Sequence, residues 1–243
     1  MKTILAPIDF SIASEKALEY IKKVFADYQL VILYVTQPGE ASNEISRRIE
    51  KFDNQFLKNT SLNYEFVITE GQLLNEIQTL AQRVQPDYII LGTHGAALAK
   101  ALVKNTSCPV FIVPEGNNTL QIRKIAYAND FNDIKNSLTL MPLTQLSRTF
   151  GAKVYIIHVN RGEDALTDHA EASLEYYLEK VDHEYVHIPG KNIEETLNAY
   201  LAEKNIDLLT VLLRDHGSNE LKSNGKLVEE IVSHARMPVL NLV

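Results

Sequence analysis

The chain has 243 residues, a formal net charge of −7 and a hydrophobic content of 45%. This length and content suffice for one large domain or for two of ordinary size, and two is the better expectation. The acidic balance argues against a nucleic-acid partner, because phosphate binding needs a basic face. The single cysteine, Cys108, cannot form an internal disulfide, which suits a reducing compartment and excludes a CxxC site.

The N-terminal residues MKTILAPIDF do not have the pattern of a signal peptide, because Pro7 and Asp9 break the apolar stretch too soon. No run of apolar residues approaches the roughly 20 that a membrane span requires. We therefore expect a cytoplasmic protein without a membrane partner.

The first predicted elements are an apolar strand at residues 3–9 (TILAPID), a helix, and a second strand at residues 30–35 (LVILYV). Apolar residues at helical spacing indicate the helix: Ala17, Leu18, Ile21, Val24 and Phe25. A third strand, YEFVITE, is closed by Gly71, and the helix LLNEIQTLAQRV follows it. Two more apolar strands, DYIILGTHG and CPVFIVP, flank a last helix.

The same order of elements recurs from residue 123, which indicates an internal repeat. The matching strands are KIAYAND, VYIIHV, HEYVHIP, DLLTVLLRDHG and MPVLNLV. The matching first helix carries Leu138, Leu140, Met141, Leu143 and Leu146. Asp9 corresponds to Asp130 and Gly71 to Gly190, so specific residues mark the register between the copies.

Residues 114–121 (PEGNNTLQ) break both periodicities and predict a linker. We therefore place domain 1 at residues 1–116 and domain 2 at residues 122–243. Several strands are continuously apolar, which is typical of a parallel sheet covered on both faces. Strands and helices alternate throughout, so each half is predicted to be a doubly wound α/β domain with about five strands.

Four features together resemble the universal stress protein family: the ILAPIDFS opening, the LYV or IHV second strand, a Gly-x-x-Gly after the fourth strand, and the closing CPVFIV. The resemblance covers essentially the whole chain, twice. It implies two tandem domains of the adenine nucleotide alpha hydrolase-like fold and a non-catalytic role in stress response or signalling. It also implies pairing through the last strands, here within one chain as an intramolecular pseudo-dimer. A further homodimer and an unidentified protein partner stay open.

One branch of this family binds ATP through Gly-x-x-Gly, nine residues and then Gly-Ser or Gly-Thr. An Asp at the end of the first strand and a Val after the second make further contacts. When this family pattern is carried over residue by residue, copy one has matching residues at Pro7, Asp9, Val35, Gly92 and Gly95. The nine-residue spacer is missing, however, and Ala96 and Ala97 stand where the Gly-Ser pair belongs. A backbone cradle without its second glycine should hold a triphosphate poorly.

Copy two departs from the same pattern. It keeps Asp130 and Val159, but Ala128 replaces the proline of the first strand. No glycine stands at the first motif position, and Gly225-Lys226 falls where Gly-Ser is expected. Both nucleotide-binding motifs are therefore predicted to be degenerate.

The alternative hypothesis keeps ATP, AMP or another small anion in the crevice of copy one. Asp9 is its strongest residue, because a carboxylate that ends a buried parallel strand faces the edge where ligands bind. Capping of the next helix is an equal alternative for Asp9, with Ser11 and Ser14 as competitors for that task. For Asp130, capping is favoured.

Four histidines are further candidates for contact with an anion or a metal ion. His94 and His216 each precede a glycine at the end of a strand, where a protonated imidazole can contact an anion, although a loop histidine without a task is commoner. His183 and His187 share a strand face but lie roughly 13 Å apart, too far to chelate one ion. We expect no metal site.

No nucleophile elbow, HExxH helix, GxGxxG fingerprint or complete P-loop occurs, so we expect no enzyme. Residues 41–58 and 163–180 carry mixed charge with sparse apolar positions. We interpret them as helices with solvated faces and not as active sites.

Overall fold

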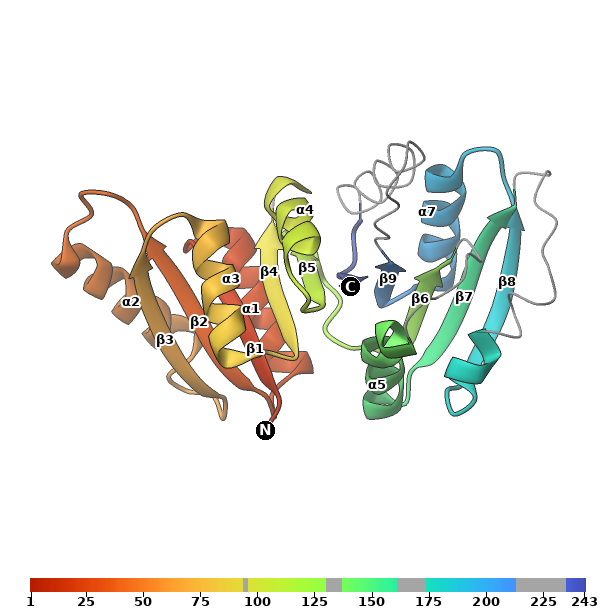
Figure 1. Cartoon of the computed structure of the whole chain (residues 1–243), viewed down its shortest axis with the longest axis horizontal. Helices are drawn as coiled ribbons and strands as arrows, with labels where there is room; N and C mark the ends of the chain where they lie inside the picture. The colour runs from red at the N-terminus through yellow and green to blue at the C-terminus, as the bar shows by residue number, and fades with distance from the viewer. Residues whose placement is uncertain (94–95, 130–136, 161–173, 213–234) are drawn as a thin grey trace. The chain divides into compact units, whose positions relative to one another are not determined.

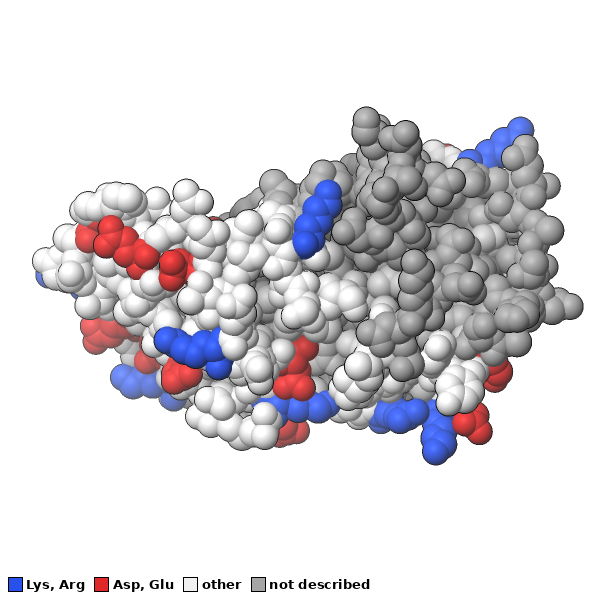
Figure 2. Space-filling view, in the orientation of Figure 1, with Lys and Arg blue, Asp and Glu red and all other residues white. Residues whose placement is uncertain are grey.

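The computed structural model describes residues 1–93, 96–129, 137–160, 174–212 and 235–243 (Figure 1). The chain divides into two compact units, Met1–Leu120 and Gln121–Val243. Within the described ranges, no helix is long and apolar enough to cross a membrane. Figure 2 shows one side of the molecule, where the described acidic and basic side chains are scattered among uncharged ones.

The first unit alternates strands and helices along the chain. Its elements are β1 (Thr3–Ile8), α1 (Ile12–Val24), β2 (Gln29–Thr36), α2 (Ser42–Phe56), β3 (Asn63–Glu70), α3 (Leu73–Val84), β4 (Tyr88–Thr93), α4 (Ala96–Asn105) and β5 (Val110–Pro114). The strand order is β3-β2-β1-β4-β5, and all neighbours are parallel. This is the predicted doubly wound α/β fold.

The second unit repeats this topology. Its described elements are β6 (Lys124–Ala128), the 3-10 helix η1 (Ser137–Leu140), α5 (Met141–Phe150), β7 (Lys153–Asn160), β8 (His183–Pro189), α7 (Ile193–Lys204), β9 (Leu208–Leu212) and β10 (Val239–Leu242). The strand order is β10-β9-β6-β7-β8, again parallel. Strand β6 therefore takes the place that β1 has in the first unit. The α-helix begins at Met141, later than Leu138 in the sequence prediction, because Pro142 fits the first turn of a helix.

Aromatic side chains fill the core of the first unit between α1 and the sheet. Tyr20, Phe25, Tyr88 and Phe111 are each no more than 2% exposed. Their rings pack against one another, with the centroids of Tyr88 and Phe111 5.2 Å apart. Burying a side chain of this size contributes about 1.5–3 kcal/mol, so this cluster fixes α1 on the sheet.

An aspartate just before the fourth strand of each unit holds the start of the first strand. The N–H of Thr3 donates to Asp87 Oδ2 at 2.8 Å. In the second unit, the N–H of Lys124 donates to Asp207 Oδ2 at 3.0 Å. These equivalent bonds, together with the strand registers, align the two units residue by residue.

Candidate functional site

The sequence-predicted residues of copy one come together at one edge of the first sheet. Pro7, Asp9, Val35 and Gly92 lie at or just beyond the carboxyl-terminal parts of β1, β2 and β4, which are adjacent in the sheet. We call these four residues the strand-end site. Ligands of open α/β sheets bind at this edge. The remaining predicted residues of both copies are Val159, which is buried near the end of β7, and His94, Gly95 and Asp130, which lie outside the described residues.

Pro7 shapes this edge through the N–H that it lacks. The carbonyl of Thr3 accepts from the N–H of Asp87, so alternate residues of β1, Pro7 among them, direct their backbone groups toward β4. The pairing of β1 with β4 ends at Leu5. In the second unit, Ala128 stands in place of Pro7, and the equivalent pairing continues as far as Ala128. The proline therefore marks the point where β1 and β4 stop being joined.

Gly92 lies against the first turn of α1. A Cβ added to it would stand 1.8 Å from the carbonyl oxygen of Ala13 and 2.9 Å from the amide nitrogen of Ser14. Only glycine fits such a close backbone approach. From the sequence, the family resemblance implies that Gly92 contacts phosphate. No sequence signal indicates that Gly92 packs against the backbone of α1. In β9 the equivalent position is Leu212.

Asp9 is exposed and organises the turn between β1 and α1. Its Oδ1 accepts hydrogen bonds from the N–H of Ser11 at 2.9 Å and from the hydroxyl of Ser14 at 2.6 Å. The helix cap itself is Ser11, whose hydroxyl oxygen accepts from the N–H of Ser14. Partial burial acts to raise the pKa of Asp9, but the bonds from Ser11 and Ser14 outweigh it and hold the pKa below its ordinary value. The carboxylate is therefore ionised at neutral pH.

The connection from β4 to α4 is short. Strand β4 ends at Thr93 and α4 begins at Ala96, so only residues 94–95 lie between them. Two residues cannot form the nine-residue loop of the ATP-binding pattern. Helix α4 therefore follows strand β4 almost directly.

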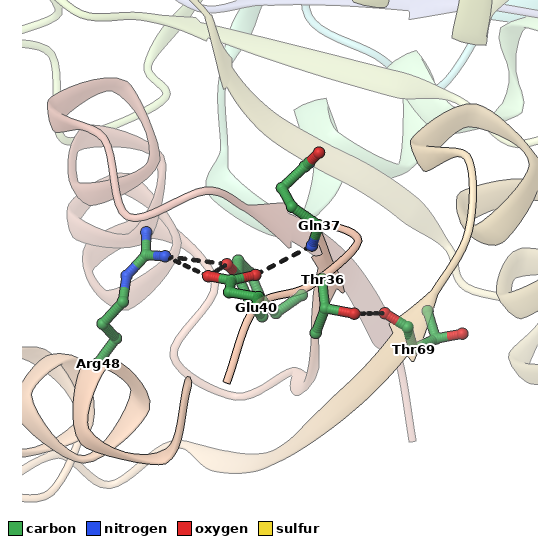
Figure 3. A network of polar contacts seen from close by, with 6 residues as sticks. Thr36, Gln37, Glu40, Arg48 and Thr69 are labelled. Atoms are coloured by element: carbon green, nitrogen blue, oxygen red, sulfur yellow. Dashed lines mark hydrogen bonds and ion pairs between the residues drawn. The ribbon is translucent and has the colours of Figure 1, made fainter. Parts of the chain in front are cut away.

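A polar and aromatic cluster at the end of β2 was missed by the sequence reasoning (Figure 3). Tyr34 and Arg48 both donate to Glu40 Oε1, at 2.7 and 2.6 Å, and Glu40 Oε2 accepts from the N–H of Gln37 at 3.0 Å. The Arg48 guanidinium lies over the ring of Phe10, 4.6 Å from its centroid. The hydrogen bond from Tyr34 holds the pKa of Glu40 below its ordinary value.

Through this cluster, one side of α2 is bonded to the end of β2, whereas the sequence predicts only a solvated face for this helix. Arg48 Nη1 also donates to the hydroxyl of Tyr34 at 3.1 Å, which ties the helix to the end of the strand. Phe10 has a φ of 62°, an unusual backbone conformation for a bulky residue, and its ring packs on Tyr34 at 4.7 Å. No sequence signal distinguished Arg48 from the neighbouring Arg47. From the sequence alone, the helix expected over residues 41–58 is distinguished only by its mixed charge.

Comparisons with known proteins agree with this topology. The profile of the Universal stress protein family matches residues 1–114. The crystal structure of a universal stress protein from Archaeoglobus fulgidus DSM 4304 superposes with a TM-score of 0.75, at 17% identity, covering 99% of this chain and 95% of that one. A functionally unknown protein from Pseudomonas aeruginosa PAO1 superposes with a TM-score of 0.69, at 13% identity, covering 100% of this chain and 92% of that one. No curated protein matches the sequence.

At these identities the two solved structures establish the fold alone, whereas the profile match concerns the sequence itself. The matched region contains Pro7, Asp9, Val35 and Gly92 and extends from β1 to the end of β5. Residues 1–114 therefore match the universal stress protein family, and the second unit repeats the topology of the first.

Proposed function

We propose that the chain is a non-catalytic tandem universal stress protein that acts in stress response or signalling through protein contacts and has lost triphosphate binding. The observation that carries this proposal is the connection of residues 94–95 between β4 and α4. A triphosphate needs a run of backbone N–H groups around it. The nine-residue spacer of the ATP-binding pattern has no place between Thr93, where β4 ends, and Ala96, where α4 begins.

Gly92 supports the same proposal. Its open side is already filled by the backbone of α1, as the 1.8 Å approach of a Cβ to the Ala13 oxygen demonstrates. The bulkier Leu212 stands at the equivalent position in the second unit. In that unit Gly225-Lys226, which stands where the pattern has Gly-Ser, lies outside the described residues.

Calorimetric titration with ATP, ADP and AMP, with and without Mg²⁺, tests the proposal. We expect no heat of binding for ATP at concentrations up to about 1 mM, which corresponds to binding weaker than about 4 kcal/mol. An ATP dissociation constant near 10 μM, about 7 kcal/mol, would overturn the loss of triphosphate binding. Nucleotide hydrolysis by the purified protein would overturn the non-catalytic role.

A second function, binding of a small ligand without a triphosphate, is favoured by the state of Asp9. The carboxylate is exposed and ionised at the ligand-binding edge of the sheet. Its bonds to Ser11 and Ser14 use Oδ1, and the lone pairs of Oδ2 can accept an N–H donor, such as the amino group of adenine in AMP. AMP is therefore the nucleotide to compare between Asp9→Asn and the control Asp27→Asn, which changes an exposed aspartate before β2. Equal AMP affinity in the two variants would remove Asp9 from the site.

The last strands provide the proposed contact between the halves. Within the first unit β5 pairs with β4, and within the second unit β10 pairs with β9, so each unit's own sheet ends at its last strand. An unpaired edge of this apolar kind favours association. We propose that β5 and β10 pair within the chain. Slow amide exchange along both strands in a monomer supports this pairing; fast exchange there, or slow exchange only in a dimer, contradicts it.

A further inference from the structure

Phe10 lies between Asp9 and Ser11 in the turn that follows β1, and its backbone is strained. Its φ of 62° falls in the left-handed region, where a bulky residue is an outlier. With this conformation at Phe10, the N–H of Ser11 turns back to Asp9, whose Oδ1 accepts it at 2.9 Å. A strained residue of this kind persists only where the surrounding structure holds it. The groups that hold Phe10 therefore also set the position of the Asp9 carboxylate.

Three side chains from two other elements hold the ring of Phe10. Tyr34 from β2 and Phe52 from α2 are buried, and their ring centroids lie 4.7 and 5.3 Å from that of Phe10. The guanidinium of Arg48, also from α2, lies over the ring with its Cζ 4.6 Å from the centroid. A cation within about 6 Å of an aromatic centroid is attracted to the face of the ring. Arg48 thus adds a directional contact to the packing of the two buried rings.

Arg48 is itself fixed in place by the end of β2 and the residues that follow it. Its Nη1 donates to Glu40 Oε1 at 2.6 Å and to the hydroxyl of Tyr34 at 3.1 Å. Glu40 Oε2 accepts in turn from the N–H of Gln37 (Figure 3). The guanidinium cannot leave the ring of Phe10 without straining or breaking these bonds. The position of the connection between β2 and α2 is therefore transmitted to Phe10.

Asp9 has a second set of bonds, which does not depend on Phe10. Its Oδ1 accepts from the hydroxyl of Ser14 at 2.6 Å, and its own N–H donates to Ser14 Oγ at 3.1 Å. Only the bond from Ser11 closes the turn around Phe10. Loss of the Phe10 conformation should break that bond and leave those to Ser14. The carboxylate would then change its orientation while staying attached to the first turn of α1.

We propose that Arg48 is a positioning residue for Asp9, which it holds at the carboxyl-terminal edge of the sheet through the ring of Phe10. The connection between β2 and α2 is thereby coupled to the turn between β1 and α1. This inference rests on the second proposed function, binding of AMP or another small ligand at Asp9, for the purpose of the coupling. The coupling itself rests on the contacts of Phe10.

Arg48→Met tests the coupling, because methionine keeps a long, flexible side chain and removes the cation. Arg47→Met, at the exposed neighbouring residue, is the matched control for the loss of one positive charge. Phe10→Ala removes the ring. In each variant, carbon-13 NMR of the carboxyl group measures the pKa of Asp9, and hydrogen exchange measures the protection of the Ser11 N–H. Circular dichroism checks the fold of each variant.

We expect the pKa of Asp9 to rise toward its ordinary value in both Arg48→Met and Phe10→Ala, because a bond to the carboxylate is lost. Exchange at the Ser11 N–H should become about tenfold faster in the same variants. Arg47→Met should change neither. Arg48→Met should have no further effect in a chain that already carries Phe10→Ala, because both changes act through one ring.

Three results would each overturn the positioning role: unchanged exchange at the Ser11 N–H in Arg48→Met, equal effects of Arg48→Met and Arg47→Met, or additive effects of Arg48→Met and Phe10→Ala. Because Arg48 is partly exposed, the comparison of Arg48→Met with Arg47→Met decides the result if Phe10→Ala does not fold.

Titration with AMP separates this role from the proposed ligand. If the wild type binds AMP, binding should be about fivefold weaker or more in Arg48→Met and unchanged in Arg47→Met. If Asp9→Asn weakens AMP binding and Arg48→Met does not, the positioning role is wrong. If the wild type does not bind AMP, while the pKa of Asp9 and the exchange of Ser11 respond as expected, the coupling stands and AMP is not the ligand.

Discussion

Gly92 in β4 and Ala13 in α1 are in backbone contact, so that a Cβ on residue 92 would stand 1.8 Å from the carbonyl oxygen of Ala13. A strand and a helix that are distant in sequence meet here without an intervening side chain. A glycine that the family resemblance assigns to phosphate binding therefore has a packing function of its own. The contact leaves no room for a Cβ on residue 92, so any side chain at this position should destabilise the first domain.

Replacement of Gly92 by alanine is expected to lower the free energy of unfolding by about 3 kcal/mol, because the added methyl group must displace the backbone of α1. Gly116→Ala is the matched control, since a Cβ there has nothing within 4 Å. Urea unfolding followed by circular dichroism measures both variants. Equal stability of the two variants would contradict the close approach.

Asp207 is expected to contribute more than Asp87 to the stability of its domain. Its Oδ2 accepts from the N–H groups of both Arg123 and Lys124, whereas Asp87 Oδ2 accepts from Thr3. Hydrogen bonds to a charged group contribute about 1.5–3 kcal/mol, so Asp207→Ala should lower the free energy of unfolding by an amount at or above that range.

Asp87→Ala is expected to have a smaller effect than Asp207→Ala. Urea unfolding resolves the two variants if the domains unfold in separate transitions, and hydrogen exchange at the first strand of each unit resolves them otherwise. A larger loss of unfolding free energy in Asp87→Ala than in Asp207→Ala would show that the bond from the Arg123 N–H to Asp207 adds no stability.

Asp9 is expected to make the first domain sensitive to acid. Its folded pKa lies below the ordinary value of 3.8 because Ser11 and Ser14 donate to the carboxylate. The unfolded chain therefore binds a proton at a higher pH than the folded chain does. The stabilisation is present above the unfolded pKa and is lost as the pH falls through the folded pKa.

The free energy of unfolding of the wild type should therefore fall more steeply below about pH 4 than that of Asp9→Asn. Urea midpoints measured from pH 7 to pH 3 give both slopes. The asparagine keeps an oxygen for the bonds from Ser11 and Ser14, so the comparison isolates the charge. Parallel curves for the two proteins would exclude Asp9 as the titrating group.

Cys108 is expected to react as a probe of unfolding. Its side chain is buried, and this burial raises the pKa of the thiol to about 12. Its Sγ also contacts the carbonyl of Pro86 at 3.2 Å. In native buffer at pH 8, an aromatic disulfide reagent should label it at a rate that follows the opening of the first domain and rises with urea. Complete labelling within seconds without denaturant would show that the thiol is accessible in the folded state.

The sequence by itself determined the repeat and the α/β class. These are properties of order along the chain. Continuous apolar strands such as LVILYV indicate a parallel sheet, and alternation with helices indicates double winding. The sequence also placed Pro7, Asp9, Val35 and Gly92 at strand ends, which is a local property as well.

The tertiary structure alone decided what these residues touch. The contact of Gly92 with Ala13 and the contact of Arg48 with the ring of Phe10 join segments that are distant in the chain. Their distances depend on strand register and on how closely a helix approaches the sheet. Helical or alternating periodicity describes which face a residue occupies but not which residue of another element lies opposite. Packing determines which residues lie opposite one another. A single methyl group at Gly92, or the N–H that Pro7 lacks, is enough to change how two elements meet.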